Sequence, residues 1–313
     1  MLTTEIAYQK ITERLQHAFK FIDALAEDES SIFYIGKSDV IKHVARNLHG
    51  TSHEATGRQL SNYVARSANL GYNTYLKTYD DPLTLAIDAS TRALYESEDP
   101  LVSTNIAKLR YLVKNGMPQM PAIYARQEPF SAALDIIDLL FITGRTSDEL
   151  FKQTMDFIFL RRDKEGIFKG YFDREAANYN IVRKKNLLAV KENVYSWSTG
   201  SQAFDQETNA TVGKVFTPDR WPIDPRIRPA AETVHQFLNN SEYPRERRYP
   251  NVALGIIHAI LVTNPNFELE YLSERKQKTL ERALSDEEAP TSERNLHTVS
   301  ELIQLQKLLS ARV

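Results

Sequence analysis

The chain of 313 residues contains no cysteine. Disulfides, thiolate nucleophiles, iron–sulfur clusters and cysteine-based zinc sites are therefore all excluded. Glycine and proline are also scarce, with 11 and 13 residues, which is too few for a fibrous or a disordered chain. Because 42% of the residues are hydrophobic, the chain can bury a substantial core. The sequence predicts a globular protein.

Long apolar runs are missing as well. The longest nearly uncharged stretch, residues 251–267, contains His258 and Pro265, whereas a membrane-spanning helix needs about 20 apolar residues. This stretch is therefore predicted to be a buried core helix. Charged residues such as Glu5 and Lys10 interrupt the first 26 residues, so we expect no signal peptide. The sequence accordingly predicts a cytoplasmic protein that does not bind a membrane.

Most of the chain has the apolar period of helices. Apolar residues recur every three or four positions in residues 3–27, 38–48, 83–96, 102–115, 130–142, 149–162, 230–239, 251–262 and 298–312. Between residues 166 and 229, short runs rich in Val, Phe, Tyr and Trp are typical of strands and loops. We therefore expect a predominantly helical α+β fold, with N- and C-terminal helical blocks around a short aromatic-rich β region. A helical domain over 1–165 and a mixed domain over 166–313 are predicted, and the two could share one core.

The net charge of −2 conceals an alternation along the chain. Residues 37–79 and 161–248 each carry a net charge of +4, whereas residues 1–36, 80–160 and 249–313 carry −3, −5 and −2. If the fold brings the two basic segments onto one face, that face would attract polyanions. An ordinary solvated surface is the alternative.

The most informative local pattern lies in residues 38–72. Two amphipathic helices are separated by a turn at Gly50, and Ser52 is placed to cap the second helix. With the small residue Ala45 in the first helix, the pattern resembles a helix-turn-helix of the repressor type. The resemblance implies that the second helix enters the major groove of DNA. Thr56 stands where an apolar residue usually anchors that helix, and an αα-hairpin without a ligand gives the same pattern.

A second candidate nucleic-acid surface lies in residues 161–228, where basic residues alternate with Phe, Tyr and Trp. Cations can follow a phosphate backbone while aromatic rings stack on unpaired bases, so this segment favours single-stranded DNA or RNA. Half-buried aromatic residues of a sheet are the alternative. The predicted nucleic-acid-binding residues of both segments are Lys42, Arg46, His53, Arg58, Gln59, Arg66, Arg161, Arg162, Arg183, Lys184 and Lys185.

Two further features favour a protein partner. One is a compact basic cluster in residues 245–248, which could bind an acidic protein. The other is the apolar stripe of the last helix, which could dock on the body of the protein or pair with a second copy. The predicted partner-binding residues are Arg245, Arg247, Arg248, Leu302, Leu305 and Leu309.

Catalytic motifs are missing from the sequence. No phosphate-binding GxxxxGK[ST] loop, GxGxxG turn after a strand or GxSxG elbow is present. His49 and His53 are separated by four positions, as in helical zinc sites, but the turn at residues 50–52 interrupts that spacing. We expect no metal, no cofactor and no catalytic residue.

Four aspartates offer one enzymatic alternative. Asp135 and Asp138 share a helix face, and with Asp156 or Asp163 they could assemble a Mg²⁺ site for phosphodiester cleavage. Alternatively, these aspartates are solvent-facing carboxylates on the outer face of a helix, which need no ligand. We prefer this interpretation to a Mg²⁺ site. The sequence thus predicts a non-catalytic protein that binds DNA or RNA. A structural or adaptor protein, for example a viral or phage assembly component, is the alternative, and a metal-dependent phosphodiesterase is a distant third.

Overall fold

The computed structural model describes residues 2–27, 38–69, 82–119, 129–169, 201–241, 246, 249–285 and 293–313. These residues form twelve α-helices and one two-stranded antiparallel sheet, which confirms the predicted predominantly helical α+β class. The helices are α1 (Thr4–Glu27), α3 (Ser38–Leu48), α4 (Glu54–Asn69), α5 (Pro82–Tyr95), α6 (Pro100–Leu112), α7 (Pro129–Ile142), α8 (Glu149–Phe159), α11 (Ser201–Val215), α12 (Ile227–Asn240), α13 (Pro250–Thr263), α14 (Glu274–Ser285) and α15 (Glu293–Ser310).

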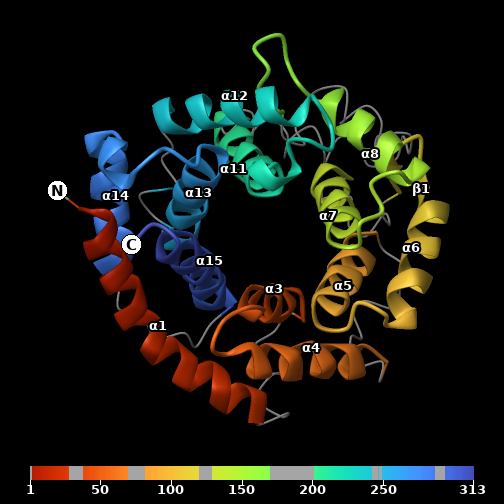
Figure 1. The fold of residues 1–313 in the computed structure, drawn as a ribbon, viewed down its shortest axis with the longest axis horizontal. Coiled ribbons are helices and arrows are strands. Elements are labelled where there is room, and N and C mark those ends of the chain that lie inside the picture. Colours follow the sequence, from red (N-terminus) through yellow and green to blue (C-terminus); the bar gives the residue numbers. More distant parts are fainter. Residues whose placement is uncertain are drawn as a thin grey trace, which may run out of the picture.

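The helices form two concentric rings (Figure 1). The inner ring runs in the order α3, α5, α7, α11, α13 and α15, and α15 contacts α3, so the ring is closed. The outer helices are α1, α4, α6, α8, α12 and α14, and each packs on the inner ring. Along the described parts of the chain, outer and inner helices alternate, so each inner helix has one side toward the outer ring and one toward the centre.

The hydrophobic core fills the space between the two rings. One continuous cluster of buried side chains includes Ile11 of α1, Leu139 of α7, Ile257 of α13 and Leu302 of α15. The apolar stretch at residues 251–267 forms α13 at the heart of this cluster, as the sequence predicts. In the described part of the chain, no helix combines the length and apolarity needed to span a bilayer. The division into units at residue 166 stays a prediction.

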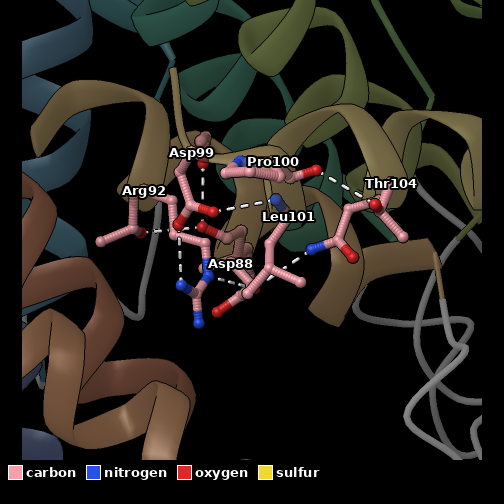
Figure 2. Close-up of polar contacts among 10 residues, drawn as sticks. Asp88, Arg92, Asp99, Pro100, Leu101 and Thr104 are labelled. Atoms are coloured by element: carbon pink, nitrogen blue, oxygen red, sulfur yellow. Dashed lines mark hydrogen bonds and ion pairs between the residues drawn. The ribbon is translucent and has the colours of Figure 1, made fainter. Parts of the chain in front are cut away.

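Local sequence signals explain how successive helices are joined. Between α5 and α6, Asp99 Oδ1 accepts a hydrogen bond from the Leu101 amide at 2.8 Å and caps α6, with Pro100 as its first residue (Figure 2). Asp99 Oδ2 also accepts a bond from Arg92 Nη1 at 2.9 Å, and Arg92 Nε donates to Asp88 Oδ2 at 2.9 Å. Burial opposes ionisation of Arg92, but the two aspartates outweigh it and raise the pKa. This network fixes the angle between an inner and an outer helix.

The predicted β region is wrong from residue 201 onward, whereas Phe168 at its start forms an isolated antiparallel bridge with Arg162. Residues 201–215 form α11, and a short 3-10 helix, η3, follows at Pro218–Arg220. Residues 170–200 lie outside the described residues. Val212 and Phe216 favour strands by composition, but their spacing of four positions places both on one buried helical face. Tertiary burial therefore overrides local propensity here.

The two described strands lie earlier in the chain, at β1 (Val113–Lys114) and β2 (Met117–Pro118). They are joined by Asn115 and Gly116, whose φ angles of 51° and 79° are both positive. Positive φ at both central residues defines the tight hairpin turn that an Asn-Gly pair favours. The apolar spacing predicts a helix over residues 102–115, but α6 ends at Leu112 because the Asn-Gly turn begins the hairpin.

Candidate functional site

The two helices of the predicted helix-turn-helix are present as α3 and α4. Gly50 adopts a φ of 73° in the turn between them, and the Gly50 amide donates to Glu54 Oε2 at 3.0 Å. α4 begins at Glu54, two residues after the predicted cap. The expected helix–turn–helix connection is therefore correct at the level of secondary structure.

The residues of α4 that were expected to read DNA make contacts within the chain, and Arg58 and Gln59 keep exposed surface. Thr56 Oγ1 donates to Asp23 Oδ1 at 2.7 Å, and Gln59 Nε2 donates to the Ala26 carbonyl at 2.7 Å, both in α1. The His53 ring stacks on Phe19 of α1 with centroids 3.8 Å apart. These residues hold α4 against a neighbouring outer helix.

The remaining predicted contacts of this element are also engaged. Arg58 Nη1 donates to the Tyr95 carbonyl at 3.0 Å, and its guanidinium lies 3.8 Å and 3.9 Å from carboxylate oxygens of Glu54 and Glu96. The pairing compensates the positive charge of Arg58. The Arg66 side chain lies outside the described residues. Thus α3 and α4 form an αα-hairpin whose second helix packs on α1 and α5.

In the second predicted nucleic-acid segment, the described basic residues Arg161 and Arg162 do not lie on an open basic surface. The Arg162 guanidinium covers the rings of Phe159 and Phe168, at 5.6 Å and 5.5 Å from their centroids, and its Nε donates to the Gly166 carbonyl. Phe168 is fully buried, so this aromatic residue belongs to the core. Arg161 is partly buried at the end of α8. Arg183, Lys184 and Lys185 lie outside the described residues.

The predicted partner stripe is part of the core. Leu302, Leu305 and Leu309 are each at most 2% exposed, because α15 belongs to the inner ring and is covered by α1, α3 and α13. The stripe therefore docks on the body of the protein, and these three leucines present no surface to a second copy. Arg245, Arg247 and Arg248 lie outside the described residues.

The two basic segments of the sequence do meet, but inside the inner ring. Arg46 of α3 forms an ion pair with Asp138 of α7, and Arg220 Nη1 lies 2.6 Å from Asp138 Oδ1. In the ring, α5 lies between α3 and α7. A pair that joins two non-adjacent helices of a ring must cross its interior, so these side chains point toward the centre.

A second ion pair crosses the ring on the other side. Lys214 Nζ of α11 lies 2.6 Å from both carboxylate oxygens of Glu301 of α15, and α13 separates these two helices. The pair passes over Gly255 of α13, where an added Cβ would lie 3.1 Å from Lys214 Nζ. The absence of a side chain at Gly255 leaves room for this crossing.

Three histidines lie beside these pairs. Burial, followed by the positive charges of Arg46, His297, Lys214 and Lys42, lowers the pKa of His43 to about 3. Burial and then Lys214 lower the pKa of His258 to about 3. These ion pairs and electrostatic contacts connect ten residues, which we define as the interior cluster: Lys42, His43, Arg46, Asp135, Asp138, Lys214, Arg220, His258, His297 and Glu301.

The electrostatic character of the interior cluster is positive around His43. All the charged groups that shift the pKa of His43 are cations. The one charged group that shifts the pKa of His258, Lys214, is also a cation. Burial lowers the pKa values of Arg46 and Arg220 to about 10, so both guanidinium groups stay protonated at neutral pH. The cluster therefore combines fixed cations with neutral imidazoles.

The side chains of the interior cluster are enclosed by helices but are not sealed from solvent. Arg46, Arg220, Lys214 and Glu301 keep 19%, 15%, 21% and 19% of their side-chain surface accessible. Asp138 is more deeply buried, with 4% of the residue exposed. Polar atoms of the interior cluster therefore keep contact with water.

The aspartates proposed for a Mg²⁺ site do not converge. Asp156 pairs with Arg226 at 2.6 Å and Asp163 with Lys169 at 3.0 Å, both away from Asp138. No group of three potential metal ligands occurs in the described residues. The preferred interpretation of Asp138 as an outer-face carboxylate is wrong, because α7 is an inner helix and Asp138 is buried between two arginines.

Sequence reasoning missed the role of His43, Lys214, His258 and Glu301. The available signal was polar side chains at helical spacing within apolar helices, such as His297 and Glu301 four positions apart. Comparisons with protein-family models, curated proteins and solved structures find no match to this chain. The site must therefore be interpreted from its own chemistry.

Proposed function

We propose that the protein binds a small anionic ligand at the interior cluster. The observation that carries this proposal is that cations of both basic segments converge. Lys42, Arg46 and Lys214 act on neutral His43, and Arg220 lies beside Arg46 and Asp138. Cations held by a rigid frame in a partly desolvated interior attract anions more strongly than the same groups on a surface.

The cost of burying these groups supports a role in binding. Removing charges from water costs several kcal/mol for each ion, and well-packed apolar residues often replace a buried ion pair without loss of stability. Ion pairs such as Lys214–Glu301 and Arg46–Asp138 are therefore poorly explained by folding alone. Perturbed titratable groups that gather in one place are typical of functional sites.

The histidines favour binding over proton transfer. General acid–base catalysis works best when the pKa of the catalytic group lies near the working pH. With pKa values of about 3, His43 and His258 exchange protons poorly at neutral pH. A neutral imidazole carries one hydrogen-bond donor and one acceptor, and one ring nitrogen of His258 is already hydrogen-bonded to Gln304.

The earlier alternatives rest on the sequence alone. Nucleic-acid binding, a protein partner for the basic cluster at residues 245–248 and a cytoplasmic location all stay predictions. The contacts of α4 with α1 do not favour the first, and Arg245, Arg247 and Arg248 lie outside the described residues.

Isothermal titration calorimetry with inorganic pyrophosphate, succinate and citrate tests the proposal, with single-stranded RNA and duplex DNA as further samples. Arg220→Met removes an interior cation yet leaves Asp138 paired with Arg46. Arg228→Met removes a surface cation that pairs with Glu232 at 3.0 Å and serves as the matched control. We expect R220M to weaken binding of a small anion about tenfold or more and R228M to leave it unchanged.

Two results would contradict the proposal. One is that no small anion binds the wild-type protein at low ionic strength. The other is that R220M and R228M have the same affinity, which would place the anion outside the ring. Binding of RNA or DNA alone would instead support the prediction from the sequence.

A further inference from the structure

Asp138 lies between two guanidinium groups that come from different parts of the chain. Its Oδ1 lies 2.6 Å from Arg220 Nη1, and its Oδ2 pairs with Arg46. Each carboxylate oxygen thus forms an ion pair with a different arginine, and Oδ2 accepts no hydrogen bond in the described part of the chain. An excess of one positive charge holds only for these three paired groups, because Asp135 near Arg46 and Asp219 near Arg220 add negative charge around them.

The Arg220 guanidinium is held in place by groups other than Asp138. Its Nη1 also donates to the Val215 carbonyl at 2.9 Å, and its Cζ lies 4.6 Å above the Phe141 ring. Arg46 is close enough to Asp135 for that carboxylate to raise its pKa against the effect of burial. Both arginines therefore have contacts that would remain if Asp138 moved aside.

The two guanidinium groups have more donors than Asp138 can use. Each guanidinium carries five N–H donors in a planar fork that matches the oxygens of a carboxylate or a phosphate. Asp138 offers one pair of oxygens to two forks and cannot satisfy both in bidentate geometry. An incoming oxyanion with two or three oxygens could bridge them better.

We propose that the Asp138 carboxylate occupies, between Arg46 and Arg220, the position that the oxyanion group of the ligand takes when it binds. The oxyanion is a carboxylate or a phosphate, and this inference rests on the proposed function. The side chain is then an internal competitor of the ligand. Binding exchanges one set of charge-assisted hydrogen bonds for another, and no covalent bond changes. Asp138 lowers the affinity for the ligand. When no ligand is bound, the Asp138 carboxylate lies between the two guanidinium groups and compensates their charge.

The substitution Asp138→Asn tests this assignment because it keeps the shape and removes the competing charge. Asp135→Asn is the matched control, since Asp135 lies one helical turn away and its loss removes the same charge from the same interior. Titrations with inorganic pyrophosphate and with succinate separate a phosphate ligand from a carboxylate ligand. We expect D138N to bind one of these probes about tenfold more tightly than wild type. D135N removes the same charge without vacating the position assigned to the oxyanion, so it should tighten binding clearly less than D138N.

A second comparison keeps the test valid if D138N does not fold. Arg46→Met leaves Arg220 and Asp138 as a one-to-one pair, and R46M/D138N then frees Arg220. We expect the double variant to bind the probe about tenfold more tightly than R46M. A purely structural role of Asp138 predicts equal or weaker binding in both comparisons.

The outcomes distinguish this inference from the proposed function. If wild type binds a probe and R220M weakens it, but D138N and R46M/D138N bind no more tightly than their parents, Asp138 is not a competitor and only this inference fails. If no variant binds either probe, both proposals fail. If D135N tightens binding as much as D138N, general charge explains the effect and the position assigned to the oxyanion is wrong.

Discussion

Replacing Gly57 by alanine separates the observed packing of α4 from a role in reading DNA. On a solvent-facing helix this change is stabilising, because alanine exceeds glycine in helix propensity by about 1 kcal/mol. In the structure, a Cβ at Gly57 would overlap the Tyr95 hydroxyl and lie 2.8 Å from Leu48 Cβ and 3.0 Å from the Ala45 carbonyl oxygen. The sign of the change in unfolding free energy therefore tells the two arrangements apart.

The magnitude follows from three contributions. Overpacking a filled site costs about 1–3 kcal/mol. Tyr95 must also give up its hydrogen bond to the Ala45 carbonyl, which costs about 1 kcal/mol more. Subtracting the propensity gain of about 1 kcal/mol leaves a net loss of about 1–3 kcal/mol. For a chain of 313 residues, this corresponds to a decrease in Tm of about 2–4 °C.

Urea unfolding followed by far-UV circular dichroism measures this change. The control is Tyr95→Phe, which removes the hydroxyl that an alanine at position 57 would meet first. In the Y95F background, G57A should cost less, by about 1 kcal/mol or more. A more stable G57A variant would refute the described packing of α4 and restore the free face that a recognition helix requires.

Three further predictions concern buried groups. Burial, followed by the charge of Lys214, lowers the pKa of His258 from 6.5 to about 3 in the folded protein. As the pH falls below 6.5, the unfolded chain therefore takes up a proton at His258 before the folded protein does. The stability that is present above pH 6.5 is lost as the pH falls toward 3. H258Q should reduce that slope by up to about 1.4 kcal/mol per pH unit in urea titrations, and an unchanged slope would show that His258 is not buried as a neutral group. Lys276→Met should cost about 3–5 kcal/mol, because Glu246 loses a buried partner at 2.5 Å; K276M/E246Q should cost less, and an equal cost in the same assay would argue against the pair. Leu305→Ala should cost about 2–5 kcal/mol in stability without altering the mass measured by sedimentation, whereas a change of mass at constant stability would support the predicted partner stripe.

The positions of most helices could be predicted because apolar spacing is a local property. α3 and the start of α4 lie within two residues of their predicted places, and the stretch around His258 forms the expected core helix. The role of α4 could not be predicted, since Gly57 is a weak helix former in isolation and a close-packing site in the fold. Local propensity has no information about which neighbour approaches.

The interior cluster depends on ring closure, which no local pattern encodes. Lys214 and Glu301 are paired across the ring although 87 positions separate them in the chain. The alternation of charge along the chain can be read from the sequence. It does not indicate whether the cationic side chains point to the outside of the ring or to its interior. His258 was the best local clue, because it is the one titratable residue among the apolar residues 253–262 of α13.

The closure of the inner ring by α15 has a consequence for how the chain is made. Asn47 Nδ2 of α3 donates to Ser300 Oγ of α15 at 2.7 Å, and Gln306 Nε2 of α15 donates to Thr12 Oγ1 of α1 at 3.0 Å. Before α15 is synthesised, the preceding helices can therefore form only an open arc. The apolar surfaces of α3 and α13 that contact α15 in the finished ring are then uncovered. Because one late helix joins two distant edges, contacts of long sequence separation form last and slowly. In this open arc the surfaces of α3 and α13 that α15 later covers are still exposed, and exposed apolar surface favours aggregation.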